Sequence, residues 1–113
     1  MKIKMINESK YIEYIGYFAA SADFDEFENR DRQSISFYSD RDVAKRHAKN
    51  KNGFVLRVKF EMKNPKILHK GLITTAHNSK KDLIDGGYDG YIMKTNNFDV
   101  YGIVNSDQII ECL

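Results

Sequence analysis

The sequence predicts a single α+β domain in which antiparallel strand pairing dominates, and three observations lead to this prediction. A chain of 113 residues is long enough for one domain with its own core. One segment alternates strictly between apolar and polar residues, as a half-buried strand does. The other apolar segments are short, separated by turn-forming residues, and only two stretches read as helices.

The alternating segment FVLRVKFEM, residues 54–62, predicts one long strand. Phe54, Leu56, Val58, Phe60 and Met62 fall on one face, and Val55 falls on the other with the three charged residues. Gly53 precedes the segment and Asn64-Pro65 follows it. Pro65 cannot donate a ladder hydrogen bond, and the residue before a proline is pushed out of the helical region. We therefore expect the strand to end before Pro65.

Two helices are expected. Ser39 can cap a helix from about Asp40 to Lys49, with acidic residues early and basic residues late, as the helix dipole prefers. Its apolar stripe consists of Val43, Ala44, His47 and Ala48. A second, very short helix follows the capping-box pair Ser79 and Asp82 and ends at Gly86. Phe24 and Phe27, three residues apart, suit one further helical turn.

The remaining elements are expected to be strands. Residues 11–19 and 33–39 are predicted strands near the N-terminus, and residues 88–93, 100–104 and 108–112 form a predicted β meander at the C-terminus. The whole of 1–113 is expected to fold as one domain.

Composition limits the classes of function. The 18 basic and 16 acidic residues leave a net charge of +2, which argues against nucleic acid as a partner. The densest basic stretch contains Lys45, Arg46, Lys49 and Lys51, and the densest acidic stretch contains Asp23, Asp25, Glu26 and Glu28. Both are interpreted as solvated faces.

Cysteine content and hydropathy point to the cytoplasm. The single Cys112 cannot form an internal disulfide, and its apolar neighbours suggest a small buried side chain. No apolar run approaches the ~20 residues of a membrane span. No zinc, dinucleotide-binding or P-loop motif is present, so no metal is expected.

Five segments in one order resemble a known family. YFAASADFDEF, SFYSDRDVAKRHA, VLRVKFEMKNP, GGYDGYI and VYGIVNSDQI, spanning Tyr17 to Ile109, resemble the small ADP-ribosyltransferase-like domains of phage and mobile-element polyvalent proteins. This resemblance implies an α+β fold with two mainly antiparallel sheets around a cleft and short helices. It also implies a bacterial host cytoplasm as the location and a host protein as the partner.

The resemblance also assigns candidate site residues. Family members carry a histidine that holds NAD on the first strand, and Phe18 stands at that position. The cofactor-contacting segment corresponds to Phe37, Tyr38, Ser39 and His47. The family's catalytic glutamate falls on Val100, and Asp99 lies one residue early.

Two functions follow from these departures. A phenylalanine can stack but cannot hydrogen-bond, and a one-residue slip along a strand turns a side chain to the opposite face unless a bulge restores it. The first hypothesis is therefore a degenerate module without a cofactor that inhibits or modulates a host protein. The alternative is an active NAD-dependent mono-ADP-ribosyltransferase, which Asp99 facing the same cleft as Tyr38 would favour. A third reading is a small α+β protein whose resemblance is accidental.

The expected partner surface is the loop from Asp23 to Arg32. Exposed aromatic and arginine side chains supply most interface energy. The loop offers Phe24, Phe27, Arg30 and Arg32. Tyr11, Tyr14 and Tyr91 are further aromatic residues expected at the surface.

Overall fold

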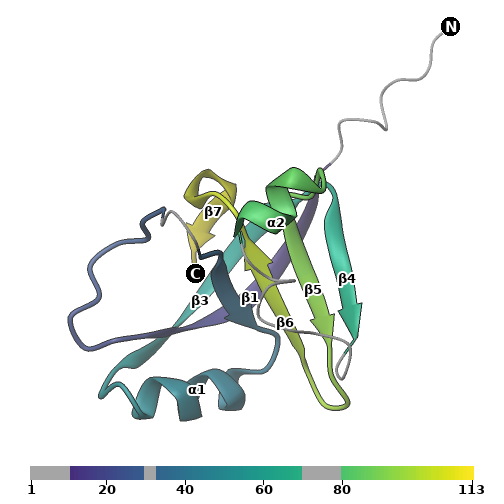
Figure 1. Ribbon diagram of the computed structural model, residues 1–113. Coiled ribbons are helices and arrows are strands. Elements are labelled where there is room, and N and C mark those ends of the chain that lie inside the picture. Colours follow the sequence, from purple (N-terminus) through teal and green to yellow (C-terminus); the bar gives the residue numbers. More distant parts are fainter. Residues whose placement is uncertain (1–10, 30–32, 70–79) are drawn as a thin grey trace, which may run out of the picture.

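The computed structural model describes residues 11–29, 33–69 and 80–113 (Figure 1). The strands are β1 (Ile12–Ala20), β2 (Ile35–Tyr38), β3 (Phe54–Met62), β4 (Pro65–His69), β5 (Gly90–Lys94), β6 (Asp99–Ile103) and β7 (Ile109–Cys112). The helices are α1 (Arg41–Lys49), α2 (Lys80–Asp85) and the short 3-10 turn η3 (Ser106–Gln108).

The seven strands of the described residues belong to one mixed sheet with the order β4-β5-β6-β2-β1-β3-β7. The predicted α+β arrangement of two mainly antiparallel sheets around a cleft is therefore wrong. It fails because β2 pairs with β6 on one side and with β1 on the other, so the strands are continuous across the middle. In addition, β4 and β5 are parallel, while the other five pairings are antiparallel.

The joint in the middle of the sheet is narrow. β1 and β2 are joined at one registered pair, Tyr17 opposite Tyr38, whereas β1 and β3 pair along nine residues. Figure 1 shows the consequence, because β1 and β3 run at a steep angle to β5 and β6. The sheet is strongly twisted at this joint, as expected where few ladder bonds hold neighbouring strands together.

The alternating pattern of β3 is confirmed, with the predicted bounds Phe54–Met62. Val58, Phe60 and Met62 are buried. They belong to a core cluster on one face of the sheet, whose other buried members are Phe37, Ile92 and Ile103. Gly16 of β1 lets Phe37 enter this core, because a Cβ at residue 16 would lie 2.7 Å from the Phe37 Cβ.

A second cluster covers the opposite face of the sheet. It comprises Leu68, Tyr91 and Val100 from the strands and Leu83 from α2. Tyr91 was expected at the surface, but it is only 5% exposed. Its ring has room because Gly102 lies opposite it in the β5–β6 ladder, and a Cβ there would collide with the ring.

Helix α1 begins one residue later than predicted and has a different cap. Asp40 is the N-cap, and its carboxylate accepts hydrogen bonds from the backbone N–H groups of Asp42 and Val43 at 2.8 and 3.3 Å. The hydroxyl of Ser39, the predicted cap, instead accepts a 2.8 Å bond from the Asp99 N–H. The apolar stripe buries Val43, Ala44 and Ala48, whereas His47 is exposed.

Other local predictions have mixed outcomes. α2 ends at Asp85, one residue before the predicted end at Gly86, and Gly87 has a positive φ of 84°. Ser79 lies outside the described residues. The segment containing Phe24 and Phe27 forms no helical turn. The C-terminal meander is wrong, because β7 pairs with β3 at the far edge of the sheet. Cys112, expected to be buried, is exposed.

No helix within residues 11–29, 33–69 and 80–113 is long and apolar enough to cross a membrane.

Candidate functional site: a groove where β1 and β2 separate

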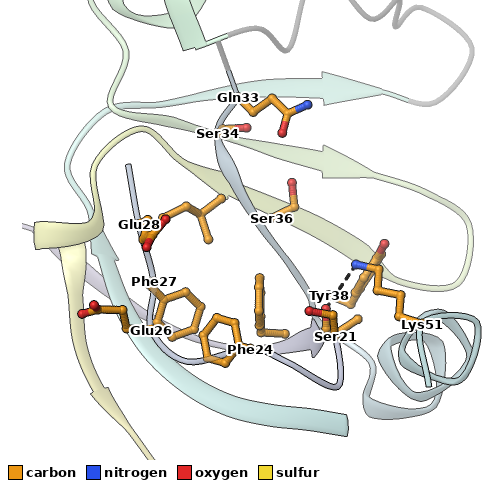
Figure 2. Close-up of a pocket in the computed structure, with 13 residues that line it drawn as sticks. Ser21, Phe24, Glu26, Phe27, Glu28, Gln33, Ser34, Ser36, Tyr38 and Lys51 are labelled. Carbon is orange, nitrogen blue, oxygen red and sulfur yellow. Dashed lines mark hydrogen bonds between the residues drawn. The ribbon is translucent and has the colours of Figure 1, made fainter. Parts of the chain in front are cut away.

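The candidate site lies beside the narrow joint of the sheet. Continuing the antiparallel register from the Tyr17–Tyr38 pair would place Ala19 opposite Ser36 and Ser21 opposite Ser34, but the β1–β2 ladder contains neither of these pairs. The two strands separate instead and leave a groove of about 300 Å³ (Figure 2). We call this hollow the β1–β2 groove. Its lining consists of Phe18, Ala19, Ser21, Phe24, Glu26, Phe27, Glu28, Gln33, Ser34, Ile35, Ser36, Tyr38 and Lys51.

One wall of the β1–β2 groove is aromatic. Phe24 and Phe27, from the loop after β1, fold back onto Phe18 of β1. The ring centroids lie 4.8 Å apart for Phe18–Phe27, 5.2 Å for Phe18–Phe24 and 5.0 Å for Phe24–Phe27, with tilted or edge-to-face geometry. Such contacts are the favoured arrangement of aromatic pairs. The loop is therefore anchored by three rings, which also leave an apolar surface for a ligand.

The strand β2 and the residue before it supply the polar side of the groove. Ser36 and Tyr38 of β2 line it, together with Ser34. The Ser36 hydroxyl lies 3.1 Å from the Tyr91 hydroxyl, which fixes its position. Burial, followed by the neighbouring Tyr91 phenol, raises the pKa of Tyr38 above 10.0. Tyr38 therefore presents a neutral hydroxyl that can donate or accept a hydrogen bond.

Charged side chains of both signs stand at the rim. The ammonium of Lys51 donates a 3.3 Å hydrogen bond to the carbonyl oxygen of Ala19, where the β1–β2 ladder is missing. Glu26 and Glu28 lie on the loop at the other side of the groove (Figure 2). The groove is therefore a mixed site in which carboxylates face a single described cation, Lys51.

The residues predicted to contact NAD are only partly brought together. Phe18 and Tyr38 line the groove. Phe37 is fully buried in the core and stacks on Phe60 with a centroid distance of 4.5 Å. The Ser39 hydroxyl is occupied by the Asp99 N–H, and His47 stacks on Tyr38 at 4.8 Å from outside the groove.

The structure places Asp99 on the face opposite Tyr38. Val100 pairs with Tyr38, and both residues contribute to the cluster that α2 covers. Because alternate residues of a strand point to opposite faces, Asp99 lies on the other side. The β5–β6 register runs without a shift through Asp99, so no bulge turns it back. Its carboxylate accepts a 3.2 Å ion-pair contact from Lys94 instead.

The predicted partner-binding residues have separate outcomes. Phe24 and Phe27 are half-buried in the groove wall rather than freely exposed. Arg30 and Arg32 lie outside the described residues. Tyr11 is exposed, at 51%, as expected. Sequence reasoning missed Ser34, Ser36 and Lys51, although the alternating serines of QSIS already indicated a polar face on this strand.

Within the described part of the chain, no three histidine, cysteine or acidic side chains gather as a metal site would require. No protein-family model, curated protein or solved structure matches this chain.

Proposed function

We propose that this domain is a non-catalytic binding module, encoded by a phage or mobile element, which modulates a host protein by binding a segment of it in the β1–β2 groove. The observation that carries the proposal is the separation of β1 from β2 beside Tyr17 and Tyr38. The separation puts a strand edge next to an aromatic wall, while the candidate catalytic acid Asp99 lies on the face opposite Tyr38 and outside the groove lining.

The groove suits an extended peptide segment. Residues 35–37, which precede Tyr38 in β2, form no ladder with β1 in the described chain. Such an edge can accept an added strand, whose main-chain hydrogen bonds give affinity. Every second side chain of that strand would then point toward Phe18, Phe24 and Phe27. The apolar wall would bind an aliphatic or aromatic side chain, and Glu26 and Glu28 would favour a basic neighbour.

The same geometry argues against NAD chemistry. Phe18 cannot donate the hydrogen bond that the family's histidine makes, and the Asp99 carboxylate is paired with Lys94 on the wrong face. Each buried hydrogen bond is worth about 1 kcal/mol or more. Losing two such bonds weakens NAD binding by about thirtyfold or more, and we expect no detectable binding below millimolar NAD.

Affinity capture from a bacterial lysate tests the proposal. The wild-type domain, Ser34→Trp, Glu28→Lys and Glu111→Lys would be compared, each with and without NAD. Ser34→Trp fills the groove, and Glu28→Lys reverses a rim charge. Glu111→Lys is the matched control, because this exposed residue lies on β7 outside the groove.

We expect the wild-type domain and the β7 control to capture the same partner whether or not NAD is present. The groove-filling variant should lose it, and the rim variant should bind it at least about tenfold more weakly. Capture that requires NAD, or undiminished capture by Ser34→Trp, would contradict the proposal.

A further inference from the structure

A second hollow, of about 510 Å³, lies between α1 and the start of β3. We call it the α1–β3 hollow. Figure 1 shows the two elements side by side at one end of the molecule. The lining residues are Arg41, Lys45, Ala48, Lys49, Asn52, Gly53, Phe54 and Val55. None of them lines the β1–β2 groove, although Phe54 contacts Phe24 of its wall, so the cations of the hollow can be changed without altering the groove lining.

Three cations line the α1–β3 hollow in a row. Arg41, Lys45 and Lys49 are spaced four residues apart, which places them on one face of α1, about 6 Å apart along the helix axis. All three are exposed. No carboxylate lines the hollow, and the two ion pairs of the described chain involve Lys81 and Lys94 instead. None of the three therefore forms an ion pair with a described side chain, although Asp40 and Asp42 flank Arg41 at the start of the helix.

This arrangement is unfavourable for the isolated helix. Like charges four residues apart repel by about 0.2–0.5 kcal/mol per pair, and the row contains two such pairs. Arg41 occupies the first helical position, where the helix dipole disfavours a cation. Of the three, only Lys49, in the last turn, fits the dipole. An anion bound along the row would reverse both penalties.

An aromatic ring stands beside the row of cations. Phe54 is 42% exposed although it is large and apolar. Its ring is oriented by an edge-to-face contact with Phe24, with centroids 6.4 Å apart. A cationic track beside an exposed ring is the combination that proteins use for single-stranded nucleic acids, in which phosphates contact the cations and a base stacks on the ring. An acidic peptide would use the cations but would leave the ring without a role.

We propose that the α1–β3 hollow binds a short stretch of single-stranded nucleic acid. Successive phosphates lie along Arg41, Lys45 and Lys49, and one base stacks on Phe54. The net charge of +2 argues against wrapping a long polyanion, but a site for three phosphates needs only this local charge. Three phosphate contacts give a slope of about −2 for log affinity against log salt.

Fluorescence anisotropy with a labelled octamer of deoxythymidine tests the proposal. The affinity is measured from about 20 to 200 mM salt, roughly the range in which the slope of log affinity against log salt is resolved. Lys45→Gln with Lys49→Gln removes two cations of the α1–β3 hollow, and we expect binding to weaken about tenfold or more and the slope to approach about −0.7. Arg46→Gln with Lys63→Gln is the matched control. It removes the same charge from exposed residues outside the hollow, and it should bind nearly as the wild type does.

A third variant, Phe54→Leu, tests the stacking contact. It should weaken binding at least about fivefold without changing the salt slope. Its circular dichroism spectrum and melting temperature show whether it remains folded. The glutamine variants alter only exposed side chains, so they test the phosphate contacts even if Phe54→Leu unfolds.

Three results would overturn the proposal. The first is no binding of the octamer at low salt. The second is equal weakening by the Lys45→Gln, Lys49→Gln variant and the matched control, which would indicate general charge attraction. The third is tight binding of a decaglutamate peptide that Phe54→Leu leaves unchanged, which would make the hollow a docking surface for an acidic protein.

Discussion

Gln108 is a buried side chain that joins three separate segments, and replacing it should destabilise the domain strongly. It is 8% exposed. Its amide nitrogen donates to the carbonyl oxygens of Glu61 and Asp89 at 3.1 and 2.9 Å. Its amide oxygen accepts from the N–H groups of Val104 and Asn105 at 3.1 and 3.0 Å. Gln108→Leu retains most of the volume but removes all four bonds.

The expected loss follows from those bonds. At about 0.5–1 kcal/mol each, four hydrogen bonds correspond to about 2–4 kcal/mol of the free energy of unfolding. This loss lowers the melting temperature by roughly 8–16 °C in a domain of this size. Urea unfolding of both proteins, monitored by circular dichroism, measures the difference, and the slope with denaturant should be unchanged.

Gln108→Glu provides a second test, because its effect on the free energy of unfolding should depend on pH. The introduced carboxylate would still accept the two N–H bonds, but it would face the Glu61 and Asp89 carbonyl oxygens without a proton to donate. The pKa of this group should therefore be raised in the folded state. The variant then loses stability, relative to the wild type, as pH rises above about 4.3.

A loss below about 1 kcal/mol for Gln108→Leu would refute the role assigned to this residue.

Three further predictions concern the groove and its surroundings. Phe27→Ala should lower the free energy of unfolding by about 2–3 kcal/mol in urea, because the Phe27 ring packs against Phe18 and the core; a near-neutral change would mean that the ring is freely exposed. Burial raises the pKa of Tyr38, so its contribution to stability is complete below about pH 10 and is lost above it. Tyr38→Phe should therefore make the urea midpoint less sensitive to pH between about 9 and 11, and an unchanged sensitivity would count against the assignment. Calorimetry should detect no NAD binding below millimolar concentrations, and a micromolar dissociation constant would restore the transferase hypothesis.

Local periodicity was sufficient to predict individual elements. The strand Phe54–Met62 and the helix ending at Lys49 follow from residue spacing and flanking turn residues, which act over a few positions. The sheet topology could not be obtained in this way. The β1–β2 joint is one residue pair, and β7 crosses to β3, so both depend on contacts between distant segments. β4 was missed because Pro65 was interpreted only as the end of the preceding strand. Proline is also tolerated at the first residue of a strand, and β4 begins at Pro65.

The candidate site was predictable to a similar extent. The family resemblance singled out Phe18, and the expected partner loop singled out Phe24 and Phe27; these three residues do come together in the groove wall. Lys51 was interpreted as part of a solvated face, because only the folded chain shows its bond to the Ala19 carbonyl, 32 residues away in sequence. Whether a side chain is exposed likewise depends on its neighbours across the sheet.

Hydrogen–deuterium exchange on the domain, alone and in the captured complex, tests whether the β1–β2 groove is the binding surface. If a partner segment adds to β2, the backbone N–H groups of residues 33–38 should gain protection, together with those of residues 18–28 in the aromatic wall. Residues 109–112 of β7, at the far edge of the sheet, should exchange at the same rate in both states. Protection confined to β7 or α1, with unchanged exchange across residues 18–28 and 33–38, would contradict the proposed binding surface.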